Sequence, residues 1–173
     1  MFSRDPLAHP EELIRRVYAY VAYRMGDGPD AEDVTSETFE RALRYRDSYD
    51  RKRGEPAAWL IGIARRCIAG AAAAPLPVPD PGAERPAAGD LEEDTVRRMT
   101  VAAGLARLSE RDRELLALRY GADLTVGQIA KLLELRPNAV EVALHRARER
   151  LAAVLAGSGG GESPESGFEA VRI

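Results

Sequence analysis

The sequence predicts an all-α fold made of two small helical domains. Hydrophobic residues make up 45% of the 173 residues and aromatic residues only 6%, with Ala and Leu dominant, which favours helices over sheets. Apolar residues recur at helical spacing in two blocks of the chain. Between the blocks, residues 71–90 are mostly Ala, Pro and Gly, and repeated prolines remove backbone donors and prevent a helix.

Domain boundaries follow from these shifts in composition. We expect helical domains over residues 1–72 and 91–156. A flexible, extended linker should join them over residues 73–90. Residues 157–173 are rich in Gly and Ser and should form a flexible tail.

The first domain should contain three helices. Pro10 fits the first turn of the first helix, and the acidic residues after it suit a helix N-terminus. The segment MGDGPD ends this helix. The second helix should run from near Asp30 to about Arg46, with apolar and charged residues on opposite faces. After the loop DSYDRKRGEP, the third helix starts near Pro56.

Four helices are expected in the second domain, the first within residues 91–108. Ser109 then caps a helix, and Thr125 with Gln128 forms a capping box that opens a short one. After a tight turn, Pro137 opens the last helix. A short helix, a turn and a longer helix with a basic end form the helix-turn-helix pattern.

Composition excludes several functional classes. The formal net charge of −3 and the pI near 5.6 exclude a nucleic-acid footprint over the whole chain, so any such surface must be local. The single cysteine, Cys67, excludes an internal disulfide and a Cys-cluster metal site, and we expect it to be buried. Neither paired carboxylates in a pocket arrangement nor a phosphate-cradling Gly loop is visible. We therefore expect no enzyme activity, no cofactor and no metal.

Membrane segments are not expected either. No apolar run approaches the roughly 18 residues of a membrane span, and the N-terminus lacks an apolar signal core. The expectation is a cytoplasmic protein without membrane contact.

Three segments, taken in series, carry a resemblance to a known family. They are DAEDVTSETFERAL (30–43), SYDRKRGEPAAWLIGIARR (48–66) and the stretch of residues 105–151. In this order and spacing they resemble bacterial sigma factors of the extracytoplasmic-function (ECF) group. The resemblance implies a first domain, region two, that binds the polymerase clamp and opens the downstream promoter element. It implies a second domain, region four, that reads the upstream element as a duplex.

The resemblance also implies the partners. These are core RNA polymerase, through its clamp coiled coil and its flap, and promoter DNA. An anti-sigma factor or another regulatory protein is a further candidate partner.

An acidic stripe on the second helix is the expected polymerase contact. The resemblance places the contact on Asp33, Ser36 and Glu37, and the same outward stripe includes Glu40. An acidic stripe suits a basic coiled-coil partner. On the residues alone, a solvated face with i,i+4 pairs from Glu37 to Arg41 and from Glu40 to Arg44 is the stronger interpretation. Together with the resemblance, we favour the polymerase contact.

A basic cluster with interleaved aromatic residues is the candidate site for the downstream element. Melted bases stack on aromatic rings and their phosphates lie in a basic groove. The candidate residues are Tyr49, Arg51, Lys52, Arg53, Trp59, Arg65 and Arg66. Trp59 lies where the family places a residue near the junction of duplex and melted strand; it could equally pack in the core. After Arg66 the chain departs from the family, continuing CIAGAAAAPLP instead of polar and basic residues. We expect a weak grip on the downstream duplex.

The last helix is the candidate reader of the upstream element. Placing Val140 at the centre of its buried face puts Leu144, Ala147 and Leu151 on the same side. The candidate DNA contacts are Lys131, Arg136, Asn138, Glu141, Val142, His145 and Arg146. Family members usually carry polar or basic residues where this chain has an acid and a valine. A carboxylate can accept from cytosine and an apolar tip can touch a thymine methyl. Alternatively, this face binds a protein, with the exposed valine as anchor.

Two functions therefore stay open. The first is an ECF-type sigma factor that directs promoter-specific transcription initiation. The second is a degenerate sigma-like protein that binds polymerase or a regulatory partner without efficient initiation.

Overall fold

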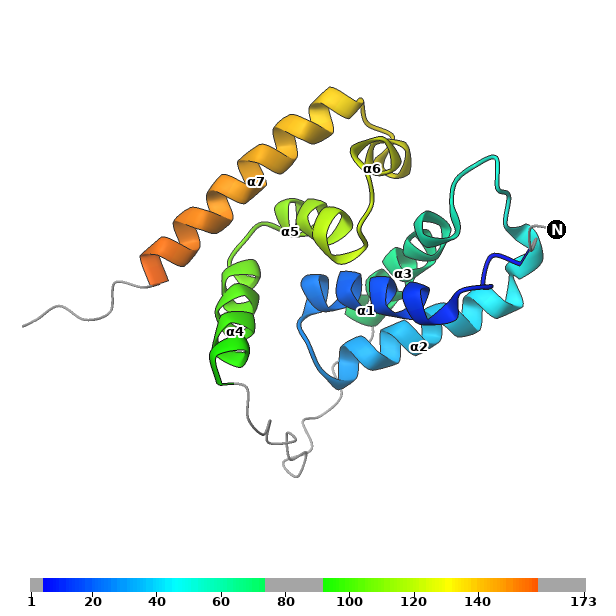
Figure 1. The fold of residues 1–173 in the computed structure, drawn as a ribbon, viewed down its shortest axis with the longest axis horizontal. Coiled ribbons are helices and arrows are strands. Elements are labelled where there is room, and N and C mark those ends of the chain that lie inside the picture. The colour runs from blue at the N-terminus through cyan, green and yellow to red at the C-terminus, as the bar shows by residue number, and fades with distance from the viewer. Residues whose placement is uncertain (1–4, 74–91, 159–173) are drawn as a thin grey trace, which may run out of the picture.

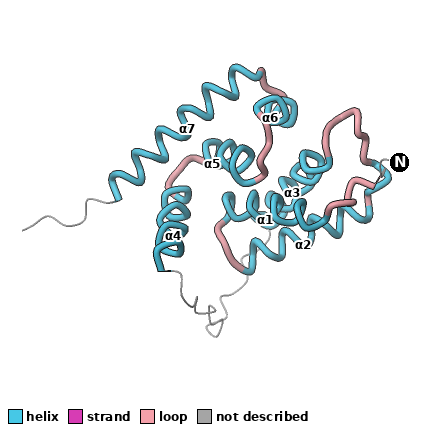
Figure 2. Tube along the Cα trace, in the orientation of Figure 1, coloured by secondary structure: helices cyan, strands magenta, loops and turns pink. Residues whose placement is uncertain are grey.

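The structure is a computed structural model that describes residues 5–73 and 92–158, and all regular structure within these residues is helical (Figures 1 and 2). The elements are α1 (Pro10–Met25), α2 (Pro29–Arg44), a 3-10 turn η1 (Arg46–Ser48), α3 (Pro56–Ala73), α4 (Glu92–Ala106), α5 (Glu110–Leu116), a π-helical turn η2 (Ala117–Gly121), α6 (Val126–Leu133) and α7 (Pro137–Ser158). The predicted all-α class with two helical domains is confirmed. Nearly all of the predicted linker and tail lies outside the described residues.

The helices of the first half form where the sequence predicts them. Gly26 and Gly28 turn the chain between α1 and α2, with φ of 97° and 135°, a conformation that side chains with a Cβ rarely adopt. The second helix ends at Arg44, two residues before the predicted end. There the backbone tightens into η1, where the Ser48 hydroxyl donates to the Tyr45 carbonyl at 2.7 Å. Cys67 is buried, as predicted.

Side-chain hydrogen bonds at the helix N-termini fix where α5 and α6 of the second half begin. The Ser109 hydroxyl accepts from the Asp112 backbone N–H at 3.1 Å and opens α5. Thr125 and Gln128 form the predicted capping box, with bonds of 3.3 Å and 2.7 Å. Glu134 then adopts a left-handed conformation with φ of 56°, which reverses the chain between α6 and α7. The helix-turn-helix is therefore formed by α6 and α7.

The two halves share one apolar core. The buried cluster runs from Val17 and Tyr20 of α1 to Leu118 and Leu124 beyond α5. Gly121 explains how closely they approach, since a Cβ there would lie 2.9 Å from the Ala19 carbonyl oxygen and from backbone atoms of Tyr20. In Figure 1, α5 lies against α1, and α7 runs along the far side of the molecule. The sequence predicted two domains but not this contact between them.

Candidate nucleic-acid interface

The predicted reading helix exposes the predicted face. Val140 and Ala147 are fully buried and Leu144 is nearly so, while Leu151 is half-buried. The candidate contacts on the other side are exposed: Asn138, Glu141, Val142, His145 and Arg146. An ion pair fixes α7 against α5, because Arg150 Nη1 lies 2.8 Å from the buried Asp112 carboxylate.

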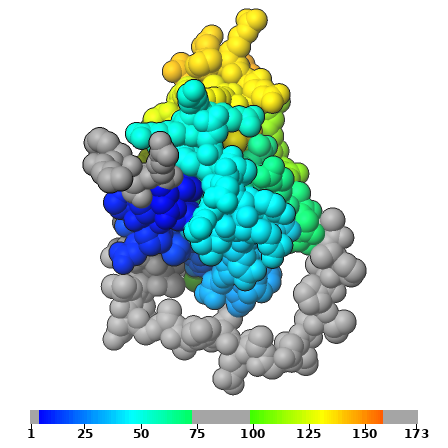
Figure 3. Space-filling view, turned by 90° about the vertical axis from the view of Figure 1, so that its right-hand side faces the viewer, coloured from blue at the N-terminus to red at the C-terminus, as the bar shows by residue number. Residues whose placement is uncertain are grey.

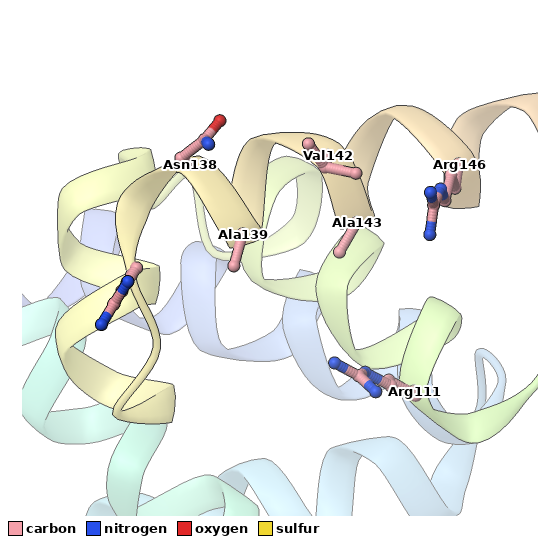
Figure 4. A pocket seen from close by; sticks show the side chains of 7 residues that line it. Arg111, Asn138, Ala139, Val142, Ala143 and Arg146 are labelled. Atoms are coloured by element: carbon pink, nitrogen blue, oxygen red, sulfur yellow. The ribbon is translucent and has the colours of Figure 1, made fainter.

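A shallow depression of about 380 Å³ lies between α7 and α5 (Figure 4). Its lining consists of Arg111, Arg136, Asn138, Ala139, Val142, Ala143 and Arg146. Figure 4 shows the two alanines on the side of α7 that faces α5, whereas Asn138 and Val142 point away from it. Three guanidinium groups and no carboxylate line the depression, so its electrostatics suit a phosphate. Short alanine side chains leave the space open.

Arg111 is a candidate contact that sequence reasoning missed. It is the second residue of α5 and lies across the depression from α7 (Figure 4). Helical spacing gives no signal for Arg111, because it shares a face with Leu115 four residues on, which is buried, whereas Arg111 itself is exposed. Only the packing of α5 against α7 shows that this surface adjoins the reading helix. Glu141, by contrast, is exposed but does not line the depression.

The downstream loop folds onto the start of α3. The rings of Tyr49 and Trp59 lie 5.4 Å apart at an interplanar angle of 58°, and the Tyr49 hydroxyl donates to the Gly54 carbonyl at 3.0 Å. Burial raises the pKa of Tyr49, so its hydroxyl stays a donor. Trp59 packs against the core yet is only half-buried, so both of its predicted roles are compatible with its position.

The predicted downstream cations do not form one patch. Arg53 and Arg66 line a cavity of about 410 Å³ together with Trp59. Arg51 lines a separate cavity of about 630 Å³ with Tyr49. Arg65 lines neither of these cavities. Instead, it forms an ion pair with α5, in which its Nε lies 2.9 Å from a Glu114 oxygen.

The cavity beside Trp59 joins the two halves of the chain. Its other wall comes from Gln128, Lys131 and Leu132 of α6. The Lys131 ammonium donates to the Lys52 carbonyl at 3.5 Å. Figure 3 shows the yellow atoms of α6 and the start of α7 directly above the cyan atoms that follow α2. The structure thus brings together residues that the sequence assigned to two different promoter elements.

The acidic stripe of α2 faces solvent. Asp33, Ser36 and Glu40 are exposed, and Glu37 is half-buried and paired with Arg41 at 2.5 Å. Of the two i,i+4 pairs in the alternative interpretation, this one forms; within the described part of the chain, Glu40 has no ion pair within 4.0 Å. An exposed pair of this kind contributes about 0.3–0.5 kcal/mol. It therefore leaves the stripe available to a partner.

The described residues, 5–73 and 92–158, offer neither a membrane-spanning helix nor a metal site. None of their helices is long and apolar enough to cross a bilayer. No group of three or more His, Cys, Asp or Glu side chains among them is arranged to hold a metal ion.

Comparison with known proteins connects these surfaces to one family. Residues 11–71 match the family model of Sigma-70 region 2, and residues 98–151 match that of Sigma-70 region 4, so the two matches cover well over half of the chain. The ECF RNA polymerase sigma factor BldN of Streptomyces coelicolor is 32% identical over 147 residues, covering 80% of this chain and 56% of BldN. The ECF RNA polymerase sigma factor ShbA of Streptomyces griseus is 48% identical over 50 residues, covering 29% of this chain and 26% of ShbA. The chain thus spans about half, or less, of the length of these relatives.

Solved structures share the fold. The sigma factor RpoE, in complex with the anti-sigma factor NepR from Bartonella quintana, has a TM-score of 0.62 at 18% identity, covering 83% of this chain and 92% of that one. CnrH, in complex with the cytosolic domain of CnrY, has a TM-score of 0.60 at 23% identity, covering 86% and 83%. Both domain matches occur in the family order, and the relatives found in sequence are ECF sigma factors. The chain therefore belongs to the sigma-70 family, within its ECF group.

Proposed function

We propose that the chain is a sigma factor that recruits core RNA polymerase to a set of promoters and directs transcription initiation there. The observation that carries this proposal is the cationic depression beside the exposed face of the helix-turn-helix. Two arginines of α7 and its preceding turn, Arg146 and Arg136, face Arg111 of α5 across uncharged alanines. Such a surface can grip phosphates on a duplex while the neighbouring residues of α7 reach base edges.

Base reading would fall to the polar and apolar tips beside the depression. Asn138 can make a bidentate pair with adenine, and Val142 can touch a thymine methyl. Glu141 can accept from the amino group of cytosine. Each good bidentate contact is worth about 1–3 kcal/mol of discrimination. Lys131 and His145 flank this surface, but Lys131 is tied to the loop of the first half and His145 lies 3.4 Å from Glu149.

The downstream element would be held by the loop and the start of α3. Tyr49 and Trp59 offer ring faces for stacking, and Lys52, Arg53 and Arg66 offer charges for phosphates. Downstream duplex affinity should be low, because α3 carries no cation after Arg66.

Core polymerase would bind the acidic stripe of Asp33, Ser36, Glu37 and Glu40 through its clamp coiled coil, and region four through its flap. Exposed carboxylates steer a basic partner, so this association should weaken as salt rises. An anti-sigma factor or another regulatory protein is proposed as a further partner, because the similar folds described above were solved with such partners. The proposed site of action is the cytoplasm.

A degenerate sigma-like protein is the second candidate function. The observation that favours it is Arg65, which is paired with Glu114 and thereby removed from the downstream DNA set. Such a protein would bind polymerase and fail to initiate.

Reconstitution with core polymerase separates the two functions. The full chain is mixed with core polymerase and a genomic DNA pool, and run-off transcripts are sequenced. The sigma proposal expects transcripts that share an upstream motif. Stable binding to core polymerase without any transcript would contradict the sigma-factor proposal and support the degenerate alternative.

A further inference from the structure

The cavity of about 410 Å³ beside Trp59 has the size and the lining of a site for a small charged molecule. Its walls come from the loop after α2, from α3 and from α6, so three separate segments of the chain converge on it. Small-molecule sites usually measure about 300–1,000 Å³ and combine apolar surface with a few convergent polar groups. The aromatic and charged members of the lining are Asp50, Arg53, Trp59, Arg66 and Lys131.

The cations of this cavity are not neutralised by the chain itself. Within residues 5–73 and 92–158, neither Arg53 nor Arg66 forms an ion pair. Lys131 makes a long hydrogen bond of 3.5 Å to an uncharged carbonyl, that of Lys52. The carboxylate of Asp50 accepts the Lys52 backbone N–H at 2.9 Å and so closes the turn of the loop. Three cations and one carboxylate leave the cavity with a net positive charge, which suits an anionic ligand.

A fixed aromatic ring adjoins open space in the same cavity. The ring of Trp59 packs against the core, and the ring of Tyr49 lies 5.4 Å from it. The neighbouring lining of α3 is small, since it consists of Ala58 and Gly62. A Cβ built at Gly62 would lie 3.9 Å from Leu132 Cδ1 of α6, which is an ordinary van der Waals distance. A planar base can therefore stack on Trp59 while its phosphates reach the cations.

Gln128 of α6 adds an oriented hydrogen-bond donor to the lining. Its Oε1 accepts the Thr125 backbone N–H at 2.7 Å in the capping box, which leaves Nε2 as the free donor of the amide. Adenine and guanine both present the acceptor N7 to such a donor. The polar lining thus favours a purine over a ligand that offers phosphate alone.

We propose that this cavity binds a purine nucleoside phosphate, with the base on Trp59 and the phosphates on Arg53, Arg66 and Lys131. The binding does not depend on the proposed function, but its consequence rests on it. Because Trp59 and Arg66 are also the proposed contacts of the melted strand, the nucleotide competes with that strand. The nucleotide additionally uses Lys131 and Gln128 of α6. Promoter opening by this chain would then respond to the concentration of a purine nucleotide.

Calorimetric titration of the full chain with ATP and with GTP tests the binding. Trp59 fluorescence is followed in parallel, because Trp59 is the only tryptophan of the chain and stacking changes its emission. We expect saturable binding of at least one nucleotide, together with a change in fluorescence. Tripolyphosphate should bind roughly tenfold more weakly than that nucleotide, because it has no base to stack. Binding of neither nucleotide, or tripolyphosphate binding as tightly as they do, overturns the proposal.

Substitutions of exposed cations locate the site. Arg66→Gln on α3 and Lys131→Gln on α6 should each weaken nucleotide binding about 3- to 10-fold, because each removes a charged donor to phosphate. Arg44→Gln is the matched control, since Arg44 is an exposed arginine at the end of α2 that does not line the cavity. Its affinity should stay close to that of the parent chain. Parent-like affinity in either cavity variant, or an equal loss in Arg44→Gln, overturns the assignment of this cavity.

Displacement of single-stranded DNA tests the consequence. A random-sequence oligonucleotide with a dansyl label is bound to the full chain, and energy transfer from Trp59 to the label is measured. Addition of the nucleotide that binds more tightly should abolish this transfer. A bound oligonucleotide that saturating nucleotide does not displace overturns the competition. An oligonucleotide that does not bind the chain counts against the proposed downstream contact, whereas the calorimetric titration still decides the nucleotide site.

Discussion

The two candidate DNA faces differ in what surrounds them. The upstream face on α7 adjoins a depression that three arginines line from within one half of the chain. On the downstream side, the arginines are divided between two cavities and an ion pair, and the other half of the chain supplies part of the wall. Both faces are basic in sequence. The difference teaches that basic residues in a sequence are not equally available to DNA, because a carboxylate of the same chain competes with phosphate for an arginine such as Arg65.

The largest effect on the free energy of unfolding should come from a substitution at the contact between the two halves. Glu114→Ala leaves Arg24, Arg65 and the Tyr20 hydroxyl without their shared acceptor in a mostly buried interface. Removing one partner of a buried pair costs about 3–5 kcal/mol, because the charges left behind stay desolvated. Urea denaturation should show this loss in the free energy of unfolding.

Glu110→Ala is the comparison for this measurement. Its carboxylate meets the same Arg24 from the solvent side, so its removal should cost less than about 1 kcal/mol. Similar losses for the two variants would show that Glu114 is no more important than a surface pair.

The upstream face on α7 is tested by removing two of the arginines that line its depression. In Arg111→Ala/Arg146→Ala, two of the three guanidinium groups of the depression are lost. Duplex affinity should fall roughly 100-fold, equally for all sequences, and the salt slope of binding should fall by about two. Fluorescence anisotropy at several salt concentrations measures both quantities.

Arg148→Ala controls for general loss of charge. Arg148 is exposed on the same helix but does not line the depression. We expect a smaller loss of affinity than for either single variant of the pair. An equal loss would mean that the depression is not the phosphate site.

Features that depend on one helix could be predicted from the sequence, whereas contacts between the two halves could not. The capping box of Thr125 and Gln128 and the buried face around Val140 depend on neighbours within one helix, and both were predicted. Glu114 and Tyr20 are 94 residues apart, and their bond depends on how the two halves meet. Within its own helix Glu114 resembles an ordinary polar residue, and Gly121 resembles a loop glycine. The exposed side of α7 was therefore predicted, whereas the position of Arg111 beside it and the contact between the two halves were not.

The substitution Glu141→Lys tests whether Glu141 contacts a base at the upstream face. Glu141 is exposed on α7 outside the cationic depression. If Glu141 contacts a base, Glu141→Lys should change the preferred base at one upstream position by about 1–3 kcal/mol. Promoter selection followed by sequencing measures this preference. Tighter binding to all sequences alike would show that Glu141 contributes only charge.

The smallest effect concerns the hydroxyl of Tyr20 at the contact between the two halves. Burial raises the pKa of Tyr20 to about 12, although the charges of Arg24 and Arg65 act in the opposite direction. An exposed tyrosine titrates near pH 10. The folded pKa is thus raised, so the stability that depends on neutral Tyr20 is fully present below about pH 10 and is lost as the pH rises through about 12.

Tyrosinate absorbance can follow this titration from about pH 9 to about pH 13 in the parent chain and in Tyr20→Phe. The parent should show a late step near pH 12 that the variant lacks. Tyr18 and Tyr49 also have raised pKa values, from the bond to Asp27 and from burial respectively, but the substitution leaves them in place and the difference between the two curves removes them. Near neutral pH the variant should lose about 1 kcal/mol, since Glu114 keeps both arginines and the hydroxyl loses only its bond to Glu114 and a longer one, at 3.4 Å, from Arg24. If the step that the variant lacks came near pH 10 instead, Tyr20 would be in contact with water, and α1 and α5 would have to be apart in solution.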